Sequence, residues 1–157
     1  MKRNAGFTLI ELVIVIIVLG ILAATAVPKF INLQDDAKES TLKGVEAALH
    51  SAANIVYSKA AINGEEAKLA STSAANGTGV ATVYGFPAAT DVKNSIELSG
   101  FKSKAGTPTN STQFYLENGA SSGNCTILYT QATSTASGTG YKIGFGDTGV
   151  LSTPTCG

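Results

Sequence analysis

Few residues of this chain have side chains suited to chemistry, and their spacing does not form a catalytic site. The sequence has one histidine, His50, and two cysteines, Cys125 and Cys156. A zinc site of four cysteine or histidine ligands needs more residues than these three. Asp35 and Asp36 are adjacent, so they would lie on different parts of a helix surface and make a poor metal pair. We therefore expect no enzyme, no cofactor, and no catalytic, cofactor-binding or metal site.

Two further patterns suggest chemistry only at first sight. His50 has no acid or second base at helical spacing beyond Glu46, which favours a packed or solvent-facing histidine over a catalyst. Residues 144–149 fit the glycine-rich fingerprint of dinucleotide-binding proteins, Gly-x-Gly-x-x-Gly. That fingerprint needs a following helix and a second strand. Eight residues follow it here, so we expect no nucleotide site.

The charge composition argues against a nucleic-acid partner. Charged residues make up 14% of the 157 residues, and 11 basic side chains balance 11 acidic ones. A protein that binds nucleic acid through its phosphates normally shows a basic excess or a basic patch. Neither is evident here. The length predicts one domain, or one small domain with an appendage.

One acidic residue lies in an unusual place. Glu11 is the only charged residue among the 21 residues from 7 to 27, which are otherwise apolar apart from two threonines. A helix of this length spans roughly 30 Å, the thickness of the hydrocarbon core of a bilayer. Lys2 and Arg3 precede it, and such flanking charges favour the cytoplasmic side. The pattern predicts a membrane-spanning helix with its N-terminus inside and the residues after about 30 outside.

Two simpler interpretations of the apolar segment stay open. A secretory signal peptide would be cleaved near Ala24-Thr25-Ala26, but its apolar core usually has only about 7–15 residues. An ordinary membrane anchor accommodates Glu11 poorly, because an acidic residue at the centre of a membrane helix costs about 2.5–3.5 kcal/mol on insertion scales.

A third interpretation explains the glutamate. Residues 6–11 read Gly-Phe-Thr-Leu-Ile-Glu after a short basic leader, and an apolar helix with Pro28 follows. This arrangement resembles the N-terminus of type IV pilins, and residues 27–37 are most similar to the mannose-sensitive haemagglutinin (MSHA) pilins. The resemblance implies that a prepilin peptidase cleaves between Gly6 and Phe7 and methylates the new amine of Phe7. It also implies that Glu11 pairs with the N-terminal amine of a neighbouring subunit.

The charge pair also follows from elementary electrostatics. Cleavage after Gly6 would remove two basic residues and expose an amine at Phe7. That amine can supply the positive partner that Glu11 lacks within its own helix. The pairing would be favoured because an unpaired charge in an apolar bundle is costly.

We expect one long helix with two halves. Residues 1–6 form the leader, residues 7–28 the transmembrane or fibre-core half, and residues 29–62 an amphipathic half that ends at Asn63-Gly64. Pro28 removes a backbone donor and Gly20 weakens the same stretch, so a kink or local unwinding is expected there. The predicted apolar face consists of Phe30, Leu33, Ala37, Val45, Ala48, Ala52 and Val56.

The remaining residues, 63–157, read as a β-rich head. Short runs rich in β-branched and aromatic residues predict strands at 80–84, 113–116, 125–131 and 141–145. Residues 91–98 suggest a brief helix, and the small polar stretches 70–79 and 133–140 suggest exposed loops. The predicted fold is α+β: a long N-terminal helix packed on a small antiparallel sheet, which is also the pilin fold that the resemblance implies.

The two cysteines lie late in the head. If the head is exported, its oxidising surroundings favour a disulfide between Cys125 and Cys156 over free thiols. Such a bridge would close a C-terminal loop, as in many type IV pilins.

The function that the resemblance implies is structural. The chain would polymerise with identical subunits into a surface fibre for adhesion and biofilm formation, after starting as an inner-membrane precursor with a periplasmic head. Its other partners would be the prepilin peptidase, an inner-membrane assembly platform and assembly ATPases. Two alternatives stay open: a type II secretion pseudopilin, and a monomeric membrane-anchored binding module.

Overall fold

The computed structural model describes residues 6–74, 79–136 and 139–157. The leader residues 1–5 and the central parts of the two expected loops lie outside the described residues. The chain divides into two units, one of residues 1–37 with Gly157 and the other Lys38–Cys156. We describe each unit by itself.

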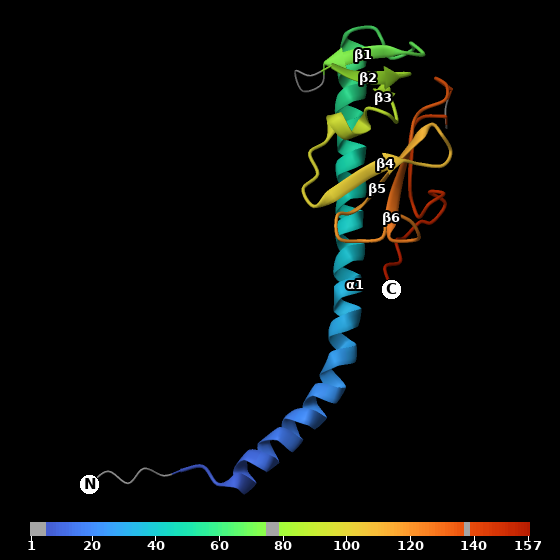
Figure 1. Ribbon diagram of the computed structural model, residues 1–157. Coiled ribbons are helices and arrows are strands. Elements are labelled where there is room, and N and C mark those ends of the chain that lie inside the picture. The colour runs from blue at the N-terminus through green and yellow to red at the C-terminus, as the bar shows by residue number, and fades with distance from the viewer. Residues whose placement is uncertain (1–5, 75–78, 137–138) are drawn as a thin grey trace, which may run out of the picture. The chain divides into compact units, whose positions relative to one another are not determined.

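One helix, α1 (Leu9–Ile62), runs through both units, as predicted (Figure 1). It stops where the sequence indicated: Gly64 has a positive φ of 68°, and its N–H donates to the carbonyl of Ala61 at 3.1 Å. The N–H of Glu65 donates back to the carbonyl of Ala60 at 2.9 Å. A left-handed glycine with such backward hydrogen bonds is a common helix C-cap.

Within the first unit, α1 is assigned as helix without a break through Gly20 and Pro28. The local unwinding expected near Pro28 is therefore not found, and a kink there stays a prediction. The large apolar side chains from Leu9 to Leu22 are all exposed.

Within the second unit, α1 buries one stripe of small and apolar side chains. Its spacing of three or four residues is that of one helix face. The predicted positions Val45, Ala52 and Val56 are confirmed, whereas Phe30 and Leu33 are exposed. The prediction also missed the two leucines at the centre of the stripe. Its buried residues are Leu42, Val45, Leu49, Ala52, Ala53, Val56 and Ala60.

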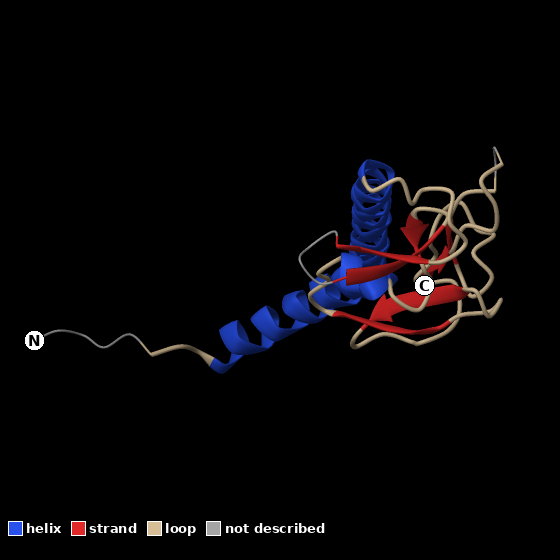
Figure 2. Cartoon of the chain, turned by 90° about the horizontal axis from the view of Figure 1, so that it is seen from above, coloured by secondary structure: helices blue, strands red, loops and turns tan. Residues whose placement is uncertain are grey.

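The strands form two antiparallel sheets rather than one, and Figure 2 shows the strands in red within the head. The smaller sheet contains β1 (Ser71–Ala74), β2 (Gly79–Val83) and β3 (Phe86–Pro87) in that order. The larger has β4 (Phe101–Ala105), β5 (Ser111–Leu116), β6 (Thr126–Thr130) and β7 (Lys142–Phe145). A short 3-10 helix, η1 (Val92–Ser95), lies between them in the chain. The predicted α+β class is confirmed.

The four predicted strands correspond to β2, β5, β6 and β7, and three strands were missed. β1 lies in the expected loop 70–79, so that loop prediction was wrong over Ser71–Ala74. β3 has only two residues, one of them a proline. β4 is largely exposed and carries Lys102 and Lys104, as edge strands often do. The predicted helix at 91–98 shrinks to the four residues of η1.

The core of the head lies between the buried stripe of α1 and the larger sheet. β5 and β6 are the central strands and are buried over most of their length. Strands covered on both faces need continuous apolar or hydrogen-bonded residues rather than alternation. The core cluster is Leu42, Val45, Leu49, Val92, Phe114, Ile127, Tyr129 and Phe145.

Candidate functional site

The N-terminus of α1 is closed by a pair of residues that cap one another. The backbone N–H of Thr8 donates to Oε2 of Glu11 at 2.8 Å, and the Thr8 hydroxyl donates to the same oxygen at 2.7 Å. In return, the N–H of Glu11 donates to the hydroxyl oxygen of Thr8 at 3.3 Å. This reciprocal pattern is a capping box, which satisfies backbone donors that the first helical turn leaves unpaired.

The capping box changes the account of Glu11. Its carboxylate has no positive partner in the described residues of the chain, but it is not without a partner, since Thr8 holds it at the start of the helix. The box holds the carboxylate of Glu11 against Thr8, the residue that follows Phe7 in the chain. The sequence analysis missed Thr8, although Thr-x-x-Glu before an apolar run is the known signature of this cap.

Phe7 and the following apolar residues are unprotected in the isolated chain. The Phe7 side chain is 89% exposed, directly before the capping box. Within the described residues, α1 is the one helix long and apolar enough to cross a membrane. A continuous apolar surface of this kind marks a site for a membrane or for other protein chains.

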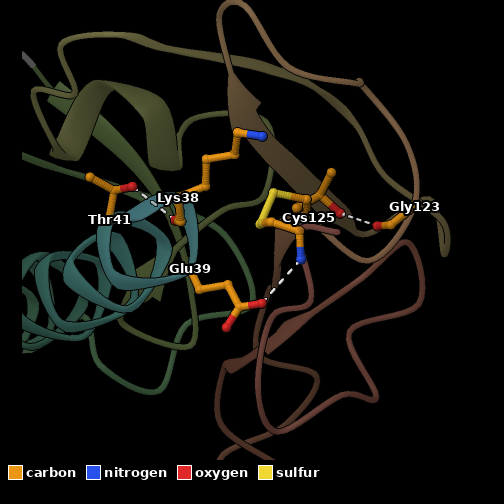
Figure 3. Close-up of a disulfide and its surroundings, with 7 residues drawn as sticks. Lys38, Glu39, Thr41, Gly123 and Cys125 are labelled. Carbon is orange, nitrogen blue, oxygen red and sulfur yellow. Dashed lines mark hydrogen bonds between the residues drawn. A yellow bond between two sulfur atoms is a disulfide. The ribbon is translucent and has the colours of Figure 1, made fainter. Parts of the chain in front are cut away.

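The disulfide predicted in the head is present. Cys125 and Cys156 are bonded, with their Cα atoms 4.6 Å apart, and the closed loop contains β6 and β7. Figure 3 shows Cys125 in the bridge and the carboxylate of Glu39 beside it. Oε1 of Glu39, on α1, accepts a hydrogen bond from the backbone N–H of Cys156 at 3.2 Å. The C-terminal end of the loop is therefore tied both to α1 and to Cys125, the residue directly before β6.

The glycine-rich run 144–149 covers the end of β7 and the tight turn that follows it. A Cβ atom on Gly144 would lie 1.9 Å from the carbonyl oxygen of Gly149, so the backbone approaches itself too closely for a side chain. Within the turn, Asp147 accepts hydrogen bonds from the side chain of Gln113 at 2.6 Å and the N–H of Gly123 at 2.9 Å. These two bonds lower the pKa of Asp147 below its ordinary value. The motif therefore has a structural role in the fold.

His50 belongs to an aromatic cluster. Its Nδ1 is hydrogen-bonded to the Tyr141 hydroxyl at 2.8 Å, and Tyr141 stacks on Tyr129 with ring centroids 5.7 Å apart. The Tyr129 hydroxyl donates to the carbonyl of Pro87 at 2.7 Å. Burial raises the pKa of both tyrosines, so both hydroxyls stay neutral. His50 is exposed on α1, and its ring contacts that of Tyr141 at a centroid distance of 5.5 Å.

No described group of three or more histidine, cysteine, aspartate or glutamate residues is arranged to hold a metal. The residues singled out from the sequence fall in separate places. Gly6, Phe7 and Glu11 lie together at the start of α1, Gly20 and Pro28 lie within the helix, and the cysteines lie in the head.

Comparison with known proteins adds to this geometry at the N-terminus. Residues 1–27 match the family model described as the prokaryotic N-terminal methylation motif. The chain is 52% identical over 50 residues to "Type IV narrow pilus major component PilA5" of Thermus thermophilus, covering 32% of this chain and 43% of that protein. It is 49% identical over 57 residues to "Type IV major pilin protein PilA" of Myxococcus xanthus, covering 36% and 26%.

A third relative comes from another system. It is "Type II secretion system core protein G" of Pseudomonas aeruginosa, 46% identical over 43 residues, which is 27% of this chain and 30% of that protein. The chain thus spans less than half the length of each of these relatives. No solved structure matches significantly.

These relatives are named as pilus or secretion-system components, which fits a protein that is not an enzyme. Their similarity covers 43–57 residues of the chain, and the match to the family model covers residues 1–27, where the cap and the start of the exposed apolar helix lie. The chain carries the N-terminal methylation motif and, over about a third of its length, it resembles the type IV pilins.

Proposed function

We propose that this protein is a structural subunit of a type IV pilus, which polymerises through the N-terminal half of α1 into a surface fibre. The observation that carries the proposal is the exposed apolar helix from Leu9 onward, which begins in a capped acidic turn directly after Phe7. Its large apolar side chains stabilise the chain only when a membrane or other helices cover them and remove them from water.

Processing would prepare this surface for assembly. The leader, residues 1–6, would be removed by a prepilin peptidase after Gly6, and the amine of Phe7 would then be methylated. Cleavage creates a positive charge close to the carboxylate of Glu11. In a bundle of such helices, the amine of one subunit pairs with Glu11 of a neighbour, and this pairing selects one axial register because unpaired charges in apolar surroundings are expensive.

Gly20 and Pro28 have a place in the same proposal. The unbroken helix seen here would bend or unwind between them when the subunit moves from the bilayer to the fibre, because Pro28 lacks a backbone donor. Gly20 allows close approach of neighbouring helices, as small residues do in membranes.

The more specific role rests on the resemblance. As in MSHA-like pili, the fibre would serve adhesion, surface attachment and biofilm formation. The precursor would sit in the bacterial inner membrane with its N-terminus in the cytoplasm and its head in the periplasm. Identical subunits, an assembly platform and assembly ATPases would be its partners.

The test combines replacement of Glu11 with analysis of sheared fibres. We expect wild-type cells to yield fibres whose subunit starts at Phe7, carries one extra methyl group and contains the Cys125–Cys156 bridge. Glu11→Ala should leave subunits in the membrane and abolish fibres, whereas the control Glu46→Gln, in the head-bound part of α1, should assemble normally. Wild-type fibre yield from Glu11→Ala would overturn the proposal.

A secretion pseudopilin is the second candidate, because one relative is a type II secretion core protein. The same experiment separates the two. A pseudopilin would show the same start at Phe7 but would remain in the envelope fraction. A monomeric membrane-anchored binding module would keep its location and its binding after replacement of Glu11.

A further inference from the structure

One edge of the larger sheet is open. β4 is the end strand of that sheet and, among the described strands, it pairs with β5 alone. Its residues from Lys102 to Ala105 are all exposed. An open edge presents a row of unpaired backbone N–H and C=O groups, which can pair with an extended segment of another chain. The assembly role proposed above concerns the N-terminal half of α1 and does not use this edge.

The hydrogen bonds at the two ends of β4 show how the ladder alternates. The N–H of Gly106 donates to the carbonyl of Ser111 at 3.0 Å, and the N–H of Glu117 donates to the carbonyl of Gly100 at 2.9 Å. In an antiparallel pair, opposite residues alternate between hydrogen-bonded and non-hydrogen-bonded pairs. The even-numbered residues of β4 therefore bond to β5, and the odd-numbered ones direct their backbone groups the other way.

This alternation assigns the groups of β4 to its two sides. Lys102 and Lys104 direct their N–H and C=O groups toward β5. The corresponding groups of Phe101, Ser103 and Ala105 point to the free edge. The side chains alternate between the faces of the sheet, and Phe101 packs against the core, so Lys102 and Lys104 lie on the opposite, outer face. The edge thus combines free main-chain groups with two cations beside them.

Two hollows lie along the inner side of β4. One has a volume of about 210 Å³ and an apolar part that includes Leu98 and Phe101. The other has a volume of about 350 Å³ and a more polar lining that includes Thr109. Lys93, on η1, and Ser103 line both hollows, so the two are neighbours along the strand. A segment added at the edge would place alternate side chains in them.

The charges along β4 favour an acidic partner. Lys102 pairs with Glu117 at 3.3 Å between two exposed side chains, whereas Lys93 and Lys104 form no ion pair within the described residues. Glu97 is the acidic residue in the linings of the two hollows. Like charges directly opposite one another across two strands are destabilising, and opposite charges attract. A second copy of β4 would bring lysines against lysines, so the charges disfavour pairing of identical edges.

We propose that the open edge of β4 binds an extended acidic segment of another protein by strand addition. The backbone of that segment bonds to the outward groups of Phe101, Ser103 and Ala105. Its acidic side chains, at alternate positions, lie opposite Lys102 and Lys104 on the outer face. The side chains between them enter the two hollows, with an apolar one beside Phe101. Main-chain hydrogen bonds supply affinity, and the charges and hollows supply specificity.

The test is a titration of the full chain, in micelles of an uncharged detergent, with the peptide Thr-Glu-Val-Glu-Leu blocked at both ends. Antiparallel to β4, this peptide places its glutamates opposite Lys104 and Lys102 and its leucine beside Phe101. We expect saturable binding and, by NMR, slower hydrogen exchange of the amides of Ser103 and Ala105, because these N–H groups face the free edge. No saturable binding, or binding without this protection, would overturn the proposal.

Two modified peptides separate strand addition from charge attraction. N-methylation of the valine blocks an N–H group that would bond to Ser103, and should weaken binding by roughly tenfold or more because a main-chain hydrogen bond is lost and its partner is left unpaired. N-methylation of the second glutamate blocks an N–H group that points away from β4, and should leave binding close to that of the unmodified peptide. Equal binding of the two modified peptides would contradict strand addition.

Charge reversal locates the site on β4. The double variant Lys102→Glu, Lys104→Glu should weaken binding of the acidic peptide by roughly tenfold or more, because two attractive cross-strand pairs become repulsive. It should gain binding of the peptide with lysines in place of the glutamates. Lys142→Glu, on β7 at the other end of the sheet, is the matched control. It should bind the acidic peptide as the wild type does.

The remaining outcomes also decide the proposal. The three lysines are exposed, so both variants should unfold at the wild-type temperature, which shows that any loss of binding is local. An equal loss in Lys142→Glu and in the double variant would indicate general charge attraction and contradict the site on β4. Self-association of the wild-type head through β4, without peptide binding, would identify a second copy as the occupant and overturn the proposal.

Discussion

Two stretches of the same helix have opposite surroundings. In α1, the large apolar side chains between Leu9 and Leu22 are 37–80% exposed, whereas Leu42, Leu49 and Ala60 are 0% exposed. The first stretch is apolar on every side, and the second is apolar on one stripe only. A helix that is apolar all round must be covered on all sides, by lipid or by other helices.

This difference separates stability from assembly. The buried stripe of α1 is already part of a core with the larger sheet, so its side chains decide whether the head folds. The exposed stretch contributes nothing to that core, so its side chains act only when the chain meets a membrane or other subunits. Substitutions in the two stretches should therefore affect different measurements.

The largest expected effect is loss of a core leucine. Leu49→Ala should destabilise the head by about 2–5 kcal/mol, because it removes buried apolar contacts and leaves a cavity. Ile16→Ala, a matched truncation in the exposed stretch, should leave head unfolding unchanged. Denaturant unfolding of both variants in micelles, followed by tyrosine signals of the head, measures the contrast. Equal destabilisation by the two variants would break the comparison.

Removal of the disulfide comes next. Replacing Cys125 and Cys156 together by serine should cost about 3–4 kcal/mol, because the bridge, which spans a sequence separation of 31, restricts the unfolded chain. The loss should appear in unfolding of the head, with the helical signal of the membrane-embedded stretch unchanged. A double variant as stable as the wild type under oxidising conditions would show that the core alone holds the C-terminal loop.

Removal of the cap of α1 should have a smaller effect on stability, and one limited to the start of the helix. Thr8→Val keeps the shape of the side chain but removes both hydroxyl hydrogen bonds, which should cost about 1 kcal/mol at the helix end. Faster amide exchange at residues 9–11, with unchanged unfolding of the head, is the expected result. A shift in the unfolding of the head would mean that the two regions are energetically coupled.

The smallest effect concerns Asp147. Hydrogen bonds from Gln113 and Gly123 lower its pKa in the folded head from the ordinary value of 3.8. The folded state therefore binds a proton at Asp147 less readily than the unfolded state does. The carboxylate thus stabilises the folded head above about pH 4, and this stabilisation is lost as the pH falls through the lowered pKa.

Since Asp147 is exposed, Asp147→Asn should cost less than about 1 kcal/mol at neutral pH. The difference in unfolding free energy between Asp147→Asn and the wild type should shrink as the pH is lowered from neutral, because the Asp147 carboxylate then takes up a proton. Unfolding of both proteins across this pH range measures it. A difference that is independent of pH would show that the carboxylate charge plays no part.

The local features of this protein could be read from its sequence. The extent of α1, its stop at Asn63-Gly64 and the apolar character of its first half depend on neighbouring residues, which the sequence displays directly. The capping box of Thr8 and Glu11 was also readable, because Thr-x-x-Glu is a local pattern, but the search for a charge partner passed over it. Strands β5, β6 and β7 were found because their β-branched and aromatic runs are strong.

The remaining features depend on contacts between distant residues, and only the tertiary structure decided them. β1 and β4 are polar strands that exist because β2 and β5 offer them hydrogen-bonding edges. Which face of α1 is buried, the one with Leu42 and Leu49, was decided by the sheet that covers it. The close approach of Gly144 and Gly149 likewise arises from packing. Helix periodicity is encoded within a few residues, whereas strand pairing and burial are properties of the folded chain as a whole.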